Sequence, residues 1–158
     1  MDFELSEKMT TILDLVTTFI DNEVIPLEGE LLHGDPATLD AAVRRAQDKV
    51  RQMELWAPNH PVELGGQGLT MVEHGLLSEA LGRTPLGHLV FGSQAPAAGD
   101  IEILNSRATE EQTERFLRPL GEGRVRRCFS LTEPMTAGFA PEPLIAHAVK
   151  DGGEHVIN

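Results

Sequence analysis

The sequence predicts a mostly α-helical protein, in which a helical domain over residues 1–122 precedes an incomplete antiparallel β segment over residues 123–158. Two observations predict this division. Apolar residues recur at steps of three and four through most of the first part, as they do on the buried face of a helix. From residue 127 onward, residues instead alternate with a period of two, which is typical of strands.

Helix signals account for the first part of the chain. The first helix is expected over residues 9–24, where apolar side chains form one stripe, and Pro26 is expected to end it. A second helix is expected to begin at Pro36, with Asp35 as its N-cap, and to run to about residue 54. These helices would form the first of two helical hairpins.

One capping signature occurs twice and predicts the second hairpin. In residues 70–73 and again in residues 109–112, a threonine is followed three positions later by Glu or Gln, so the two side chains can satisfy each other's free backbone donors. Gly82 and Gly121 are the expected C-terminal stops. A shorter helix is expected over residues 100–104.

Residues 56–68, between the hairpins, are rich in proline and glycine and are expected to form an irregular loop. The run Gly-Gly-Gln-Gly at residues 65–68 could be taken for a phosphate-binding loop, but no strand precedes it and no Gly-Lys-Ser/Thr follows it. It is expected to be a connection in which the backbone closely approaches another segment.

Alternation predicts strands at residues 127–132, 146–149 and 154–158, with a turn at residues 151–153. The outer edge of the last hairpin would lack a partner, and unpaired edge groups are a liability because they attract other chains. The β segment is therefore expected to be incomplete.

Charge argues against two classes of partner. The chain has 25 acidic and 13 basic residues, a formal net charge of −12, and no basic run longer than Arg126-Arg127. Nucleic acids and anionic membrane surfaces need clustered cations, so neither is expected as a partner. No apolar run approaches about 18 residues, so no membrane span is expected either.

Cysteine and histidine usage gives no metal or disulfide pattern. The single cysteine, Cys128, suits a reducing compartment, and the acidic N-terminus does not resemble a basic leader, so a cytoplasmic location is expected. The histidines show no HExxH or paired spacing, so no metal site is expected. Surface or capping roles are expected for all six: His33, His60, His74, His88, His147 and His155.

Residues 128–134, Cys-Phe-Ser-Leu-Thr-Glu-Pro, end a predicted strand, and Ala137-Gly138 follow shortly after. On spacing alone, Thr-Glu-Pro could simply terminate the strand. Together with Ala-Gly, however, it resembles the TEP…AGSD signature of acyl-CoA dehydrogenases. Four further segments resemble family segments in the family's order: residues 55–69, 79–86, 109–123 and 148–158.

This resemblance covers the whole chain but only the first part of the family's fold. It implies an N-terminal helical domain, a middle β-domain and a C-terminal helical bundle, with FAD held between subunits or domains. The implied reaction is FAD-dependent α,β-dehydrogenation of an acyl-CoA thioester to a trans-2-enoyl-CoA. Electron-transferring flavoprotein would be the redox partner, and a homo-oligomer or a partner subunit would complete the enzyme.

No catalytic residue is assigned within the chain, because the family's glutamate base lies in the C-terminal part, which the 158 residues do not include. The chain alone is therefore expected to be inactive. The alternative is a non-catalytic truncated or split subunit that completes, or assembles with, another acyl-CoA dehydrogenase-like chain.

By resemblance, Phe129, Leu131 and Thr132 would line the flavin ring, with Thr132 acting through its hydroxyl and amide. Glu133 could serve as a general base, since a partly buried carboxylate can take an α-proton next to a thioester. The resemblance instead implies that Glu133 fixes the loop beneath the flavin. The same caution applies to Glu142.

Gly138 and Phe139 would contact the substrate. The family has serine and aspartate where this chain has Phe139 and Ala140. Phenylalanine cannot donate a hydrogen bond and is larger, so either the substrate is held differently or ordinary activity has been lost. Residues 91–94 occur where the family lines its acyl pocket, and ordinary core packing is an equal alternative for them.

Overall fold

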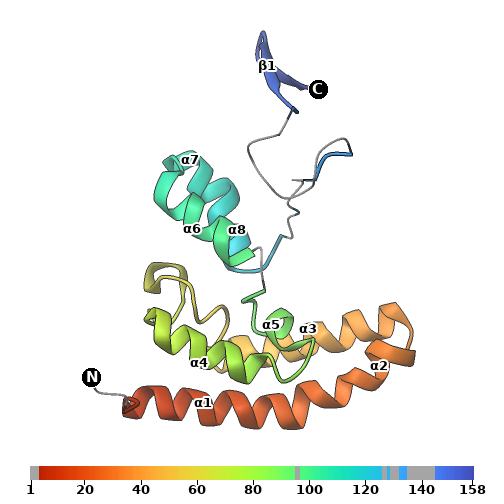
Figure 1. Ribbon diagram of the computed structural model, residues 1–158, viewed down its shortest axis with the longest axis vertical. Helices are drawn as coiled ribbons and strands as arrows, with labels where there is room; N and C mark the ends of the chain where they lie inside the picture. Colours follow the sequence, from red (N-terminus) through yellow and green to blue (C-terminus); the bar gives the residue numbers. More distant parts are fainter. Residues whose placement is uncertain (1–3, 95–96, 126–127, 129–131, 135–144) are drawn as a thin grey trace. The chain divides into compact units, whose positions relative to one another are not determined.

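The computed structural model describes residues 4–94, 97–125, 128, 132–134 and 145–158. The chain divides into two compact units, Met1–Arg127 and Cys128–Asn158. The first is helical and the second contains a two-stranded antiparallel sheet, as Figure 1 shows. The predicted fold class is confirmed, whereas the domain division at residues 122 and 123 stays a prediction.

The N-terminal helical segment is longer than predicted. Helix α1 (Glu7–Phe19) continues through a π-helical turn η1 (Ile20–Val24) and a 3-10 turn η2 (Ile25–Leu27) into α2 (Glu28–His33). The expectation that Pro26 ends the helical segment was wrong. Proline lacks a backbone N–H, and Pro26 lies in the first positions of a new turn, where that N–H is not needed.

Helix α3 (Pro36–Gln52) begins as predicted. The Oδ2 atom of Asp35 accepts a hydrogen bond from the backbone N–H of Thr38 at 3.0 Å, and Pro36 takes the first helical position. Asp35 is therefore an N-cap, which satisfies one of the donors that a helix start leaves free.

The helix start predicted from the capping signature at residues 70–73 is also confirmed. Helix α4 (Met71–Leu81) carries a reciprocal capping box, in which Thr70 N–H donates to Glu73 Oε2 at 2.8 Å and Glu73 N–H donates to Thr70 Oγ1 at 3.3 Å. The bonds from Thr70 lower the pKa of the Glu73 carboxyl. The next helix, the single-turn α5 (Gly87–Val90), was not predicted.

The last helical group consists of α6 (Ala97–Arg107), α7 (Glu110–Gln112), the π-helical turn η4 (Thr113–Leu117) and α8 (Arg118–Gly121). Thr109 and Gln112 form the predicted capping box, with Gln112 N–H donating to Thr109 Oγ1 at 3.3 Å. Helix α6 exceeds the predicted residues 100–104 on both sides.

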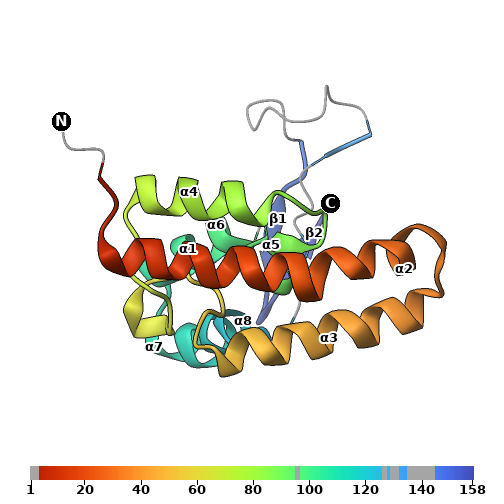
Figure 2. The same cartoon turned by 90° about the horizontal axis from the view of Figure 1, so that it is seen from below.

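The hydrophobic core gathers residues of α1, η1, α3, α4 and α5. Helix α1 runs alongside α4, as Figure 2 shows, and α3 completes the cluster. Phe91, which follows α5, is fully buried and meets Phe19 of α1 edge to face, with ring centroids 5.6 Å apart. Within the described residues, no helix combines the length and apolar character needed to cross a membrane.

The loop between α3 and α4 contains one 3-10 turn, η3 (Val62–Leu64), and folds tightly on itself. A Cβ on Gly66 would lie 1.8 Å from the carbonyl oxygen of His60, so only glycine fits there. The expected close backbone approach is therefore confirmed. The expectation that all histidines take surface or capping roles was wrong for His60, which is only 3% exposed.

The second unit contains strands β1 (Ala148–Asp151) and β2 (Glu154–Ile157). They pair antiparallel with Val149 opposite Val156, and Gly152 takes a φ of 59° in the turn. This hairpin confirms the last two predicted strands. Of the predicted strand at residues 127–132, the described residues Cys128 and Thr132 belong to no regular element, and residues 129–131 lie outside the description.

Replacing Phe91 tests the core. Phe91→Leu removes the edge-to-face ring pair and leaves part of its volume unfilled, so the free energy of unfolding should fall by about 1–2 kcal/mol. Urea unfolding measures this change. Phe116, which is 47% exposed, supplies the matched control, and Phe116→Leu should change stability by less than about 0.5 kcal/mol. Equal losses in the two variants would contradict the packing assigned to Phe91.

His60 should make stability depend on pH. Burial lowers its pKa below the usual 6.5, so the unfolded chain binds the proton more readily than the folded one. The free energy of unfolding should therefore fall as the pH drops below about 6.5, and His60→Leu should flatten this slope in urea titrations between pH 8 and pH 5. Burial also lowers the pKa of His88, so part of the slope should remain. His33→Leu, at an exposed histidine, is the control for loss of a histidine. An unchanged slope in His60→Leu would refute the assignment of the pH dependence to His60.

Candidate functional site

Glu133 is tied to the start of the hairpin. Its carboxylate accepts hydrogen bonds from the backbone N–H of Ile145 at 3.0 and 3.2 Å, and from that of Ala146 at 2.7 Å. A carboxylate whose two oxygens both accept backbone hydrogen bonds is held in one place. These bonds support the structural role of Glu133 over the role of general base.

Thr132, the first choice for a flavin contact, lies directly before this anchor and is exposed. Its hydroxyl can both donate and accept a hydrogen bond, and its backbone contributes one donor. A flavin ring carries both donors and acceptors along its edge, so this donor set fits it. The anchor at Glu133 limits how far Thr132 can move.

The other predicted site residues lie outside the described residues. These are the flavin contacts Phe129 and Leu131 and the substrate contacts Gly138 and Phe139. Ala140 and Glu142 lie outside them as well. Their roles stay predictions.

For residues 91–94, the sequence left two alternatives, lining of an acyl pocket and ordinary core packing. Phe91 packs in the core, where it is fully buried. Ser93 is 6% exposed, and its Oγ lies 3.5 Å from His88 Nδ1, at the outer limit of a hydrogen bond. Gln94 is exposed. The segment thus stays buried as far as Ser93 and reaches the surface at Gln94.

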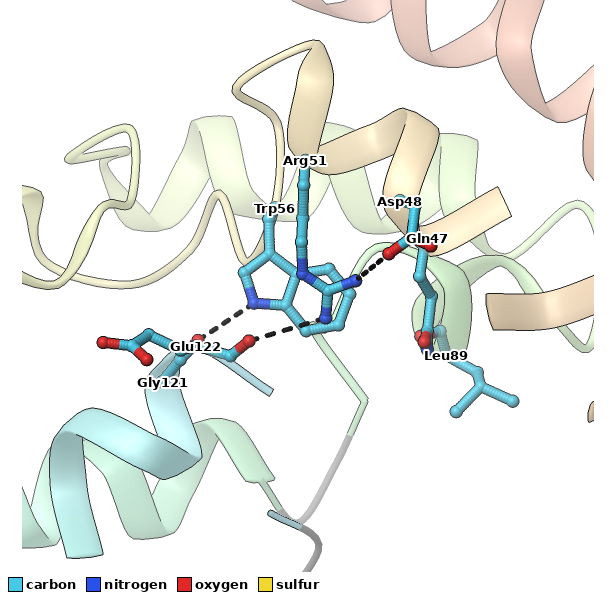
Figure 3. A network of polar contacts seen from close by, with 7 residues as sticks. All are labelled: Gln47, Asp48, Arg51, Trp56, Leu89, Gly121 and Glu122. Carbon is cyan, nitrogen blue, oxygen red and sulfur yellow. Dashed lines mark hydrogen bonds and ion pairs between the residues drawn. The ribbon is translucent and has the colours of Figure 1, made fainter. Parts of the chain in front are cut away.

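Sequence reasoning missed a group of contacts around Trp56, which Figure 3 shows. The indole N–H donates to the carbonyl oxygen of Gly121 at 2.9 Å. The Arg51 guanidinium stacks on the ring, 3.8 Å from its centroid, and its Nη2 lies 3.5 Å from the carbonyl oxygen of Glu122. Trp56 therefore connects the end of α3 to the end of α8.

Two glycines close around the same ring. Gly92 and Gly123 have φ values of 67° and 69°, and a Cβ on either would lie 2.6 or 2.5 Å from Cζ2 of Trp56. Both backbone conformation and space therefore demand glycine. We call Trp56, Arg51 and the glycines they contact, Gly92, Gly121 and Gly123, the Trp56 clamp.

Helix α3 reaches a second segment from the same face. The side-chain amide of Gln47, one helical turn before Arg51, donates to the carbonyl oxygen of Leu89 at 3.0 Å. Leu89 lies in α5, two residues before Phe91. Two side chains of α3 thus hold both segments that meet at Trp56.

An open cavity of about 430 Å³ adjoins the clamp. Its charged side chains, Arg51, Glu54 and Glu122, are of mixed sign. Within the described ranges, no group of three or more His, Cys, Asp or Glu residues is arranged to hold a metal ion.

Comparisons with known proteins agree with these observations. The family model described as acyl-CoA dehydrogenase, N-terminal domain, matches residues 6–124. The mouse protein acyl-CoA dehydrogenase family member 10 is 34% identical over 98% of this chain and 15% of its own length. (R)-benzylsuccinyl-CoA dehydrogenase of Thauera aromatica is 30% identical over 100% of this chain and 41% of its own length.

A solved structure from Mycobacterium abscessus, assigned as an acyl-CoA dehydrogenase, superposes with a TM-score of 0.89 at 34% identity. It covers 99% of this chain, which spans 42% of that protein. The chain therefore spans less than half the length of each relative named here. Because the family model matches most of the chain, the protein belongs to the acyl-CoA dehydrogenase family, through the N-terminal domain of that family.

Proposed function

We propose that this chain contributes the N-terminal domain and one wall of the flavin site of an FAD-dependent acyl-CoA dehydrogenase. The enzyme would convert an acyl-CoA thioester to a trans-2-enoyl-CoA. The observation that carries this proposal is the anchored pair Thr132-Glu133 in a chain of this family, because the pair holds a hydrogen-bonding side chain at a defined place.

The residues of this chain would bind and orient rather than carry out the bond-breaking steps. Thr132 would hold the flavin edge through its hydroxyl and amide, and Phe129 and Leu131 would cover part of the ring. When bound, FAD would supply the two-electron acceptor that amino-acid side chains lack. Gly138 and Phe139 would contact the acyl-CoA.

The proton-accepting group would come from a later part of the polypeptide or from a partner chain. Glu133 is unsuited to that role because its carboxylate is bound to the backbone at Ile145 and Ala146. Electron-transferring flavoprotein would receive the electrons, and assembly as a homo-oligomer or with a partner subunit would complete the site. We place this activity in the cytoplasm.

A non-catalytic subunit is the second candidate, and one observation favours it. Phe139 and Ala140 stand where the family has serine and aspartate. The natural polypeptide's intact mass separates the candidates. A mass well above 17.2 kDa supports the enzyme, whereas a mass of 17.2 kDa supports a subunit that works with a partner chain or has a non-catalytic role.

Thr132→Ala tests the flavin contact directly. Loss of one hydrogen bond should weaken FAD binding by about three- to tenfold, measured by equilibrium dialysis on the protein at its natural chain length. Thr132→Ser keeps the hydroxyl and should bind FAD as the wild type does. Equal affinity in all three proteins would exclude the Thr132 hydroxyl as a flavin contact, and a wild type that binds no FAD would exclude the proposed function itself.

A further inference from the structure

We propose that the helical unit contains a part that opens separately from the rest. This part consists of α6, α7, the π-helical turn η4 and α8, residues 97–121, and we call it the α6–α8 group. The Trp56 clamp holds the group against the core formed by α1 to α5. When the clamp opens, the group leaves that core and unfolds while α1 to α5 stay folded. This inference concerns the helical unit alone and does not depend on the proposed function.

The α6–α8 group has a small apolar core of its own. Ile101 of α6 and Leu117 of η4 are each 2% exposed, yet neither belongs to the continuous core cluster of α1 to α5. Helix α6 packs on η4 and α8, and Figure 1 shows α6, α7 and α8 together. Two other large apolar side chains of the group, Ile103 and Phe116, are 59% and 47% exposed. The group therefore buries little apolar surface within itself, and the hydrophobic stabilisation of its own fold is small.

The Trp56 clamp joins the group to the main core. The indole ring packs against that core, and its N–H donates to the carbonyl oxygen of Gly121, at the end of α8, at 2.9 Å. A Cβ on Gly123 would lie 2.5 Å from the ring, so the backbone that follows α8 lies directly against it. Arg51 adds a long contact, with its Nη2 3.5 Å from the carbonyl oxygen of Glu122. These contacts connect the end of α8 to a ring that belongs to the other part.

Beside the clamp, the boundary between the two parts is hollow. The cavity of about 430 Å³ is lined by Leu64, Gly65 and Gln67 on the side of the main core. Gly121 and Glu122 line it on the side of the α6–α8 group. Side chains do not fill this stretch of the boundary, so packing there adds little to the contacts of the clamp.

Detachment of the α6–α8 group should be coupled to its unfolding. Residues 97–121 are fewer than the roughly 40 residues below which chains usually need staples or partners to fold. Helices as short as α6 are also marginal in water when they pack on nothing. Opening of the clamp should therefore expose the backbone amides of the group to solvent while those of α1 and α3 stay protected.

Amide hydrogen exchange of the full chain tests the proposal, because exchange reports the opening of each helix separately. In the wild type, the amides of the α6–α8 group should be at least about tenfold less protected than the most protected amides of α1 and α3. Equal protection in the two parts would overturn the proposal, because they would then open together.

A conservative change in the main core tests whether the two parts open independently. Ile12 of α1 is 6% exposed, and Ile12→Val removes one methylene from the main core. Exchange of the most protected amides in α1 and α3 should become about two- to tenfold faster. Exchange in the α6–α8 group should stay at the wild-type rate, because the group opens while the main core is still folded. An equal acceleration in the group would show one cooperative unit and overturn the proposal.

Gly123→Ala tests the role of the clamp. Gly123 has a φ of 69°, and the added methyl group would meet the Trp56 ring, so the closed state should lose stability relative to the open state. Exchange in the α6–α8 group should become at least about fivefold faster. Gly65→Ala is the matched control, because Gly65 also has a positive φ, 85°, but its Cβ would meet nothing within 4 Å.

Gly65 belongs to the loop on the main-core side of the boundary, so Gly65→Ala should leave exchange in the α6–α8 group at the wild-type rate. Wild-type exchange in Gly123→Ala, or an equal acceleration of the group in both glycine variants, would overturn the role assigned to the clamp. The Ile12→Val result is independent of both glycine variants, so the proposal stays testable even where Gly123→Ala does not fold.

Discussion

The contact between the Trp56 ring and the glycines around it is the constraint on which the arrangement of the helical unit depends. Gly92 and Gly123 approach the ring so closely that neither position could carry a side chain. The ring also donates to Gly121, so α8 is held by a directional bond as well as by packing. The core behind it, centred on the Phe19–Phe91 ring pair, holds the same turn from the other side.

The sequence predicted the elements whose signals are local. Asp35, Thr70 and Thr109 each cap a helix through a residue only three positions away, so the pattern can be read directly from the chain. The prediction at Pro26 was wrong because a proline that begins a new turn and a proline that ends a helix give the same signal in the sequence. His60 misled because its burial depends on how the loop folds, not on its neighbours in sequence.

In the candidate site, too, the residues with a local sequence signal were predicted and those without one were missed. The resemblance identified Thr132 and Glu133 from a short motif, and the bonds of Glu133 to Ile145 and Ala146 support the structural role inferred for it. The Trp56 clamp has no comparable signature, because the glycine to which the indole N–H donates lies 65 residues away and contributes only a backbone carbonyl. A lone tryptophan in a loop rich in proline and glycine was the single hint in the sequence.

The anchor at Glu133 also bears on the departure from the family's motif. Phe139 and Ala140 lie, in sequence, between Glu133 and the backbone groups that Glu133 binds. The two ends of this stretch are thus joined by bonds that do not involve the altered residues. Replacing serine and aspartate there can change contacts with an acyl-CoA without removing the support of Thr132. Under the proposed function, flavin binding and acyl specificity would therefore be separable, and retention of FAD would be compatible with an altered substrate.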